Sequence, residues 1–503
     1  MKAMPDHDIK YQPGQSELVL PDTMKLLSQE YGITHAQFKE NGMKVALVPC
    51  GKGGSLMMRR VCEGGSRLET AETAGVCHVL EHADFRSADW LKFGGIDKNA
   101  STSKLFIEHQ AYMLLDPSAN HLETELSFQR DTMLGNNLRG LAGADIIREV
   151  NNVKDEGLFN SQRGSYARNM IMKMEELLLP RVWEGGWAHP TIGLDHGQRI
   201  TINNAEELVR LHHQFRGPSR TTLVLAGPID TNKALQLASD YFADIAPNTE
   251  LLDIPRTCAP TSSGLALGNV STNSGTRGIA VGFLAPPYGP DTEVLGLMQH
   301  LVGMLGSQPA VEQHGLSDVS MYLPSDKSAS VVTILAKVST RDADEENAMR
   351  EAQHALEEHI LAPLRNFSDD ATLRELQRQA AVTIDEALQS GPQTAAALAI
   401  RGILAADKPA LSWYPPRPIT ASRVRDVANA VFDDEQMGIV RATERDDSVG
   451  LARQSPRNAF VMSLMGHTTA PAQMFPTEYD VSHLRLTARA LPLPAYLPNP
   501  PSI

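Results

Sequence analysis

The strongest constraint on the fold is an order of secondary structure that occurs twice along the chain. The predicted strands are 44–50, 57–65, 94–103, 106–116 and 221–229 in the first half, and 278–287, 318–323, 330–338 and 436–443 in the second. The predicted helices are 69–93, 118–138, 143–160, 205–216 and 231–245, then 291–307, 342–364, 369–390, 393–406 and 420–431. A repeat of this size predicts two similar domains, each with its own core. We therefore expect an α+β fold of the α/β sandwich type, with a mostly antiparallel sheet and packed helices in each domain.

The domain boundaries are expected where the composition changes. At 503 residues the chain is too long for one ordinary core. The segment 251–277 is rich in Pro, Ser, Thr and Gly, so we predict a linker between an N-terminal domain, 1–250, and a C-terminal domain, 278–466. The last segment, 467–503, is rich in proline and is predicted to be an extended tail.

The composition argues against several classes of function. Hydrophobic residues make up 42% of the chain and charged residues 21%, and no apolar run is long enough to span a membrane. The net charge of −14 argues against a nucleic-acid partner, which would need a basic face. Four cysteines do not suggest a disulfide framework, and the N-terminus lacks the apolar core of a signal peptide. We therefore expect a cytoplasmic protein with neither a membrane nor a nucleic acid as partner.

The stretch GVCHVLEHADF at 75–85 carries the candidate catalytic chemistry. On the helix predicted here, His78 and His82 lie one turn apart on the same face, with Glu81 beside them. A catalytic zinc takes three protein ligands and leaves one position for water, so a third ligand must come from elsewhere and Glu81 would act as the base. The alternative is that two packed or solvated histidines and a carboxylate share a helix face by chance.

Several spaced motifs resemble the pitrilysin/insulinase family of zinc metallopeptidases, which carry an inverted zinc motif and are called inverzincins. The segments that carry the resemblance are CEGGSRLETAETAGVCHVLEH, GGIDKNASTS, REVNNVKDEGLFN and WAHPTIG. The resemblance covers most of the first half and continues more weakly in the second. It implies a two-domain chain that forms half of a clamshell, binds Zn²⁺ and hydrolyses peptides.

The resemblance also implies roles for individual residues. His78, His82 and Glu156 would hold the zinc ion, and Glu81 would deprotonate the attacking water and pass the proton to the leaving amine. Glu149 lies two turns before Glu156 and would orient a ligand histidine from outside the ligand set. The alternative for Glu149 is an ordinary surface carboxylate.

A substrate-binding strand is implied as well. Asn99 and Ala100 fall on the edge strand that, in the family, accepts the peptide as an added β-strand. Their alternative role is only to form a turn and a strand.

Other cysteine and histidine residues are expected to stay outside the metal site. Cys77 is turned about 100° away from His78 on the helix, so it is predicted to be a small buried side chain. His189, His212 and His213 are predicted to be loop or surface residues, and His109 could approach the cleft.

The second half departs from the family in one functional feature. Many members carry there an Arg and a Tyr that clamp the substrate and its oxyanion; here Gly315-Leu316 is present, but Val311 and Asp318 stand at those two positions. Tyr322 or a residue of the tail could compensate, and loss of an oxyanion donor would cost a factor of about 10² or more. A dimer is therefore expected, with a zinc-less paralogue favoured slightly over a second copy of this chain.

Three functions stay open on the sequence alone. The first is a zinc endopeptidase that hydrolyses short or unfolded peptides with Glu81 as general base. The second is a non-catalytic structural or regulatory subunit of a heterodimeric peptidase. The third is a dedicated protease that matures a presequence or a peptide.

Overall fold

The structure is a computed structural model of the chain. It describes residues 17–30, 32–50, 54–86, 96–114, 120–163, 166–183, 189, 191–194, 197–272, 276–287, 289–323, 330–339, 345–379, 391–406 and 419–444. These residues all belong to one compact unit, Met1–Gly450. The predicted tail, 467–503, lies outside the described residues.

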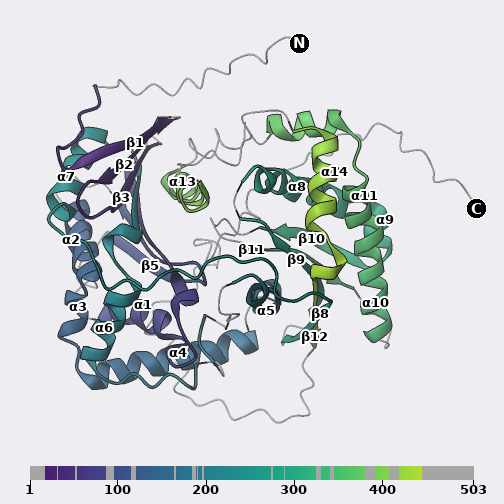
Figure 1. Cartoon of the computed structure of the whole chain (residues 1–503), viewed down its shortest axis with the longest axis horizontal. Helices are drawn as coiled ribbons and strands as arrows, with labels where there is room; N and C mark the ends of the chain where they lie inside the picture. Colours follow the sequence, from purple (N-terminus) through teal and green to yellow (C-terminus); the bar gives the residue numbers. More distant parts are fainter. Residues whose placement is uncertain are drawn as a thin grey trace, which may run out of the picture. The chain divides into compact units, whose positions relative to one another are not determined.

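The first half of the chain contributes a seven-stranded mixed sheet (Figure 1). Its strands are β1 (Met24–Glu30), β2 (Ile33–Phe38), β3 (Lys44–Pro49), β4 (Ser55–Glu63), β5 (Ile96–Thr102), β6 (Phe106–Leu114) and β7 (Thr221–Gly227). Their spatial order is β1-β2-β3-β7-β4-β6-β5, and only β3 and β7 pair in parallel. The sequence TTLVLAG of β7 is buried at every position, as expected for a strand at the centre of a sheet with both faces covered.

The second sheet repeats five strands of the first. It consists of β8 (Ala266–Thr272), β9 (Arg277–Ala285), β10 (Leu316–Tyr322), β11 (Ser330–Val338) and β12 (Met437–Glu444). Read as β8-β12-β9-β11-β10, it follows the order β3-β7-β4-β6-β5 of the first sheet, and its parallel pair, β8 with β12, matches β3 with β7. The predicted α+β fold with two similar, mostly antiparallel sheets is therefore confirmed.

Helices cover the sheets, and most of those in the described residues match a predicted helix apart from their ends; the helices at Tyr166–Leu178 and Pro309–Gln313 were not predicted. They are α1 (Val76–Arg86), α2 (His121–Leu134), α3 (Asn136–Arg139), α4 (Gly143–Arg163), α5 (Tyr166–Leu178), α6 (Ala205–Phe215), α7 (Thr231–Phe242), α8 (Pro290–Gly306), α9 (Pro309–Gln313), α10 (Glu345–Leu356), α11 (Ala362–Arg365), α13 (Pro392–Ala406) and α14 (Ala421–Val431). The single helix predicted at 118–138 is divided into α2 and α3 because Gly135 has a φ of 65° and ends α2 in the left-handed conformation. A π-helical turn, Glu357–Leu361, joins α10 to α11.

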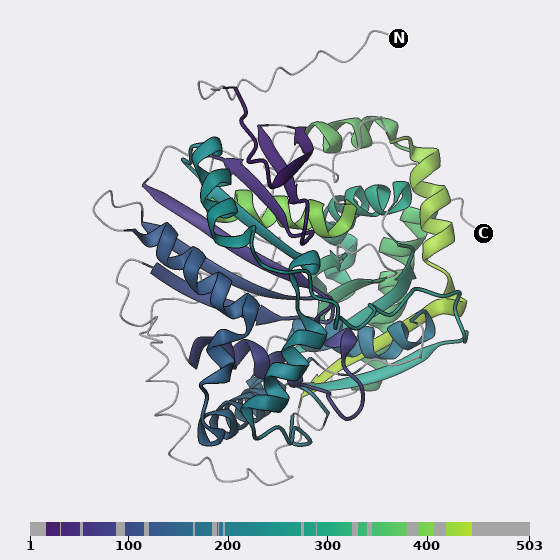
Figure 2. The ribbon, with the colours of Figure 1, turned by 60° about the vertical axis from the view of Figure 1, so that its left-hand side comes forward.

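In the described residues, each half of the chain contributes helical packing to the sheet of the other half. Helices α2 and α7 cover one face of the first sheet, where Leu225 and Phe242 are fully buried, and α13 from the second half packs against β3, β4 and β7 (Figures 1 and 2). Conversely, α5 from the first half packs on β8, β9, β11 and β12. Gly282 and Gly438, paired on adjacent strands, make room for Met174 of α5, whose side-chain atoms lie 2.3 Å and 2.5 Å from where a Cβ on each glycine would be. The domain boundaries predicted at 250 and 278 stay a prediction. Each sheet, however, packs against a helix from the other side of these boundaries.

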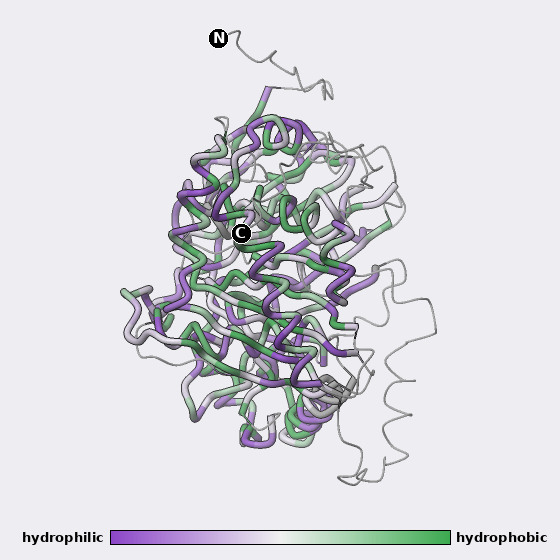
Figure 3. The backbone as a smooth tube through the Cα atoms, turned by 90° about the vertical axis from the view of Figure 1, so that its right-hand side faces the viewer, coloured by the Kyte–Doolittle hydropathy of each residue, from purple (hydrophilic) through white to green (hydrophobic). Residues whose placement is uncertain are grey.

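Hydrophobic and hydrophilic stretches are interspersed along the chain (Figure 3). Within the described residues, no helix combines the length and the apolar character that crossing a membrane requires.

The strand β8 lies inside the segment predicted to be a linker. It was missed because it is an edge strand with Leu267 66% exposed, so its composition resembles that of a loop.

Candidate metal centre

The helix that carries the histidines is fixed at its first turn by a buried carboxylate. Glu69 accepts hydrogen bonds from the backbone N–H groups of Gly75 (2.8 Å) and Cys77 (2.5 Å), which are free donors at the start of α1. Its Oε2 also lies 3.1 Å from Nε2 of His189. The helix therefore begins at Val76, and the predicted start at 69 is wrong because Gly75, with a φ of 95°, turns the chain immediately before it.

A second buried network holds the other end of the same helix. Asp84 on α1 pairs with Arg216 and lies 2.9 Å from Nε2 of His109, whose Nδ1 lies 2.9 Å from Arg60. Burial opposes the charged form of Asp84, but Arg216, His109 and Arg60 outweigh it and hold the pKa of the carboxyl well below its usual range. Because both ends of α1 are anchored, its metal-facing side is presented in one orientation.

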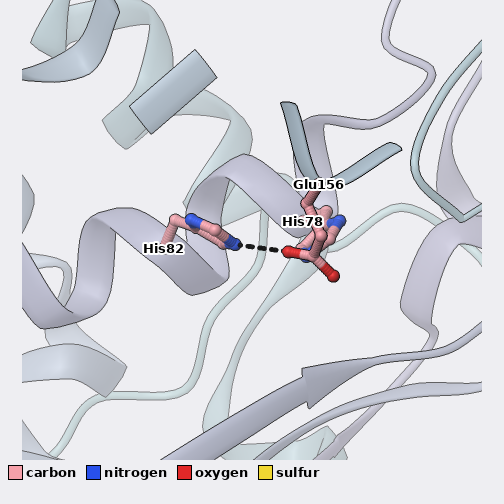
Figure 4. Close-up of side chains that lie close together, drawn as sticks. All are labelled: His78, His82 and Glu156. Carbon is pink, nitrogen blue, oxygen red and sulfur yellow. Dashed lines mark ion pairs between the residues drawn. The ribbon is translucent and has the colours of Figure 1, made fainter. Parts of the chain in front are cut away.

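The structure brings His78, His82 and Glu156 together (Figure 4). Oε2 of Glu156, on α4, lies 3.5 Å from Nε2 of His78 and 3.3 Å from Nε2 of His82. One ligand atom from each residue falls within 4.8 Å of the others. In the part of the chain that the structure describes, no second group of three His, Cys, Asp or Glu residues is arranged in this way.

The three residues fit a zinc ion. Ligand atoms at about 2.0–2.1 Å from a tetrahedral zinc lie roughly 3.4 Å from one another. The separations of 3.3 and 3.5 Å between Glu156 and the two histidines match that value, and two imidazoles with one carboxylate are a usual zinc ligand set. The histidine side chains are 10% and 14% exposed while that of Glu156 is 36% exposed, so the site is open on one side.

Glu149 stands behind His82 rather than at the surface. Its Oε2 lies 3.5 Å from Nδ1 of His82, while Arg86 pairs with Oε1 and Asn152 donates to Oε2 at 2.8 Å. The alternative of a surface carboxylate is wrong, since Glu149 is only 4% exposed. Burial disfavours charge on His82, but Glu149 and Glu156 outweigh it and raise the pKa of His82 to about 10. Burial also opposes charge on Glu156, yet the two histidines lower the pKa of its carboxyl.

Glu81 lies beside the three residues without joining them. Its Oε2 is 3.9 Å from Nε2 of His78, and it accepts a hydrogen bond of 2.6 Å from the hydroxyl of Thr102 at the end of β5. Glu81 as a whole is 8% exposed. This bond to Thr102 was not predicted, and the sequence spacing offers no signal for it.

The edge strand β5 therefore runs alongside the metal centre. It is the outermost strand at one edge of the first sheet, and it carries Asn99, which is exposed, and Ala100, which is half-buried. Oδ1 of Asn99 accepts the N–H of Ala100 at 2.9 Å. The assignment of these two residues to substrate binding stays a prediction.

The remaining histidines do not join the site. His189 lies in a loop, as predicted, but is buried at 3% exposed. His212, predicted to be a loop or surface residue, is fully buried on α6, and His213 on the same helix is half-buried. Nε2 of His212 lies 2.8 Å from the carbonyl of Thr132. His109 points to Asp84 and not to a cleft. Cys77 is fully buried, as predicted.

The positions where relatives were expected to carry an Arg and a Tyr have other roles in the second half. Val311 is fully buried on α9. Asp318 lies in an irregularity of β10 with a φ of 50°, and its carboxylate is 2.6 Å from Nζ of Lys337. No residue at these two positions can therefore donate to an oxyanion.

Comparison with known families and sequences points to one group of proteins. The family model described as "Peptidase M16 inactive domain" matches residues 204–379. The chain is 25% identical, over 281 residues, to the zinc protease PqqE of Helicobacter pylori. This match covers 52% of this chain and 60% of that protein. It is also 25% identical, over 201 residues, to the mitochondrial core protein I of the ubiquinol-cytochrome-c reductase complex of Euglena gracilis, covering 36% of each. Both matches span less than two thirds of the relative's own length.

Solved structures share the fold. A protease from Helicobacter pylori superposes with a TM-score of 0.65 and 19% identity, covering 82% of this chain and 99% of that one. Pitrilysin superposes with a TM-score of 0.59 and 16% identity, covering 84% of this chain and 45% of pitrilysin. At these identities the likeness concerns the fold alone.

Proposed function

Because the chain has the pitrilysin-like fold of the M16 family, we propose that it is a zinc-dependent endopeptidase that hydrolyses short or unfolded peptides. One observation carries the proposal: Glu156 lies at zinc-ligand spacing from both His78 and His82, with the carboxylate of Glu81 next to them. A scaffold protein has no need of such a base beside a ligand set.

The residues at this site would have distinct roles in peptide hydrolysis. A zinc ion held by His78, His82 and Glu156 would supply a Lewis acid and lower the pKa of bound water. Glu81 accepts the proton of the attacking water and delivers it to the amine nitrogen as the peptide C–N bond breaks. Glu149 holds His82 by its Nδ1 side, which leaves Nε2 directed towards Glu156.

Substrate binding is proposed at β5. As the outer strand of the sheet, it offers backbone N–H and C=O groups to an extended peptide, and that mode of binding is tolerant of sequence. Asn99 and Ala100 would lie in this contact, where the N–H of Ala100 would exchange its bond to Oδ1 of Asn99 for one to the peptide. Backbone pairing with β5 does not select a sequence. Contacts with the side chains of the peptide would decide between any unfolded peptide and a dedicated presequence.

A second candidate function is that of a non-catalytic subunit. It is favoured by the similarity to core protein I and by the description "inactive domain" of the matching family model. That match, at 204–379, lies entirely after Glu156, so it concerns a part of the chain without the candidate ligands. The absence of a donor at Val311 and Asp318 also fits a heterodimer in which a zinc-less partner supplies those groups. We favour this heterodimer slightly over a homodimer, and we also propose a cytoplasmic location.

Replacement of the base separates these functions. In Glu81→Gln we expect about one zinc per chain, as in the wild type, and turnover of a quenched-fluorescence peptide reduced by about 10²–10⁴-fold. Glu206→Gln, an exposed glutamate of α6, serves as the matched control and should keep full turnover. Equal turnover in Glu81→Gln would remove the base assignment, and zinc binding without any turnover in the wild type would favour the subunit.

A further inference from the structure

The edge strand β5 and the helix α1 are joined by one buried side-chain hydrogen bond. The hydroxyl of Thr102 donates to Oε2 of Glu81 at 2.6 Å, and the two residues are 6% and 8% exposed. A hydroxyl that donates to an ionised carboxylate at this distance forms a strong, charge-assisted bond. Because water is largely excluded, the bond fixes the orientation of the carboxylate.

The hydroxyl itself is held by the strand and not by a flexible loop. Thr102 pairs with Ile107 of β6, and the next residue, Ser103, closes the hairpin with an N–H bond of 2.9 Å to the carbonyl of Phe106. Alternation along β5 places Thr102 on the same face as Lys98, whose Nζ lies 2.6 Å from Glu125 of α2. This face of β5 is therefore bound to helices, while the backbone edge of the strand stays outermost.

A carboxylate that acts as a base needs one oxygen free and its plane held. The bond from Thr102 uses Oε2 of Glu81, which is also the oxygen 3.9 Å from Nε2 of His78. It leaves Oε1 as the acceptor for a proton from water. Without the bond, the last torsion of the Glu81 side chain is broad and roughly two-fold, so the carboxylate would rotate.

We propose that Thr102 is a positioning residue that sets the orientation of Glu81 and couples it to the edge strand. This inference rests on the proposed peptidase function. A peptide that pairs with β5 extends the sheet at the strand from which the hydroxyl projects, so the base stays aligned when substrate is bound. The effect should appear in the rate of the bound complex and not in the binding of substrate.

The experiment compares Thr102→Val, which keeps the shape and removes the donor, with Thr102→Ser, which keeps the donor. In Thr102→Val we expect kcat to fall by about 10–100-fold with KM changed less than about twofold, and in Thr102→Ser kcat should return to within about threefold of the wild type. Zinc content should stay at the wild-type value in both, and the melting temperature should fall by no more than a few degrees in Thr102→Val, because the buried carboxylate of Glu81 loses one hydrogen bond. The matched control is Thr333→Val, a buried threonine of the second sheet whose hydroxyl has no hydrogen-bond partner among the described residues.

A crystal structure of each variant supplies a readout that does not depend on activity. The carboxylate of Glu81 should turn from its wild-type orientation in Thr102→Val and return to it in Thr102→Ser. An unchanged carboxylate, an unchanged kcat, a change in KM alone, or a serine variant no better than the valine variant would overturn the proposal. If the wild type neither binds zinc nor cleaves peptides, the peptidase function fails by itself, and the crystallographic comparison still tests the positioning.

Discussion

Nδ1 of His82 lies 3.5 Å from Oε2 of Glu149, on the side of the ring opposite to Glu156. An imidazole that donates from Nδ1 to a carboxylate presents the lone pair of Nε2, which is the form that binds a metal. Arg86 and Asn152 hold Glu149 in place. In the neutral, metal-binding form of His82, the tautomer is therefore selected by residues that do not touch the metal position.

Glu149→Gln should weaken zinc binding without abolishing it. The amide cannot accept the Nδ1–H bond with the strength of a carboxylate, so we expect the zinc dissociation constant to rise by about 10–100-fold. Competition with a chromogenic chelator measures it. Asp155→Asn, an exposed residue of the same helix, should leave the constant unchanged, and a Glu149→Gln constant equal to that of the wild type would refute the role.

Zinc affinity should depend steeply on pH. In the metal-free protein the pKa of His82 is raised to about 10, so below that value the ring carries a proton that zinc must displace. One proton released from this ring makes the dissociation constant fall by about tenfold for each pH unit between pH 6.5 and 8. Titration of the metal-free protein at several pH values checks this, and an affinity independent of pH would contradict it.

Glu69→Ala should destabilise the protein through the start of α1. The change leaves the N–H groups of Gly75 and Cys77 and the ring of His189 without their carboxylate partner, so the free energy of unfolding should fall by about 2 kcal/mol or more. Urea denaturation measures the loss. Glu72→Ala is the control, because Glu72 is exposed and should change stability by less than about 0.5 kcal/mol.

Asp84→Asn should destabilise the protein at the C-terminal end of α1. It leaves the buried guanidinium of Arg216 without its counter-charge, so we expect a loss of about 3–5 kcal/mol in the free energy of unfolding. The lowered pKa of Asp84 means that its contribution is present above the unfolded pKa of about 3.9 and is lost as the pH falls through the folded value. A variant as stable as the wild type at pH 7 would contradict this reading.

The sequence was sufficient for the parts of the site that depend on local geometry. Helical spacing places His78 and His82 on one face, and seven-residue spacing places Glu149 and Glu156 on one face of α4. The repeated order of strands predicted two similar sheets, which the topology confirms. In each of these cases, the relevant neighbours are close in sequence or repeat with a fixed period.

The features that were missed depend on contacts between distant segments. Glu69 and His189 are paired across a large sequence separation, and neither has a local pattern that indicates the pair. The exchange of α5 and α13 between the two sheets is equally invisible in local periodicity, because an amphipathic helix does not specify which sheet it covers. The strands β1 and β2 were also not predicted, and they extend the first sheet beyond the five strands that repeat.

The metal content of purified protein tests the central assignment most directly. After dialysis against micromolar zinc, we expect about one zinc per chain in the wild type and in Glu206→Gln, and little or none in a variant with both His82→Ala and Glu156→Ala. Elemental analysis gives the number without reference to any substrate. A wild-type chain that holds no zinc, or a double variant that retains as much zinc as the wild type, would contradict the assignment.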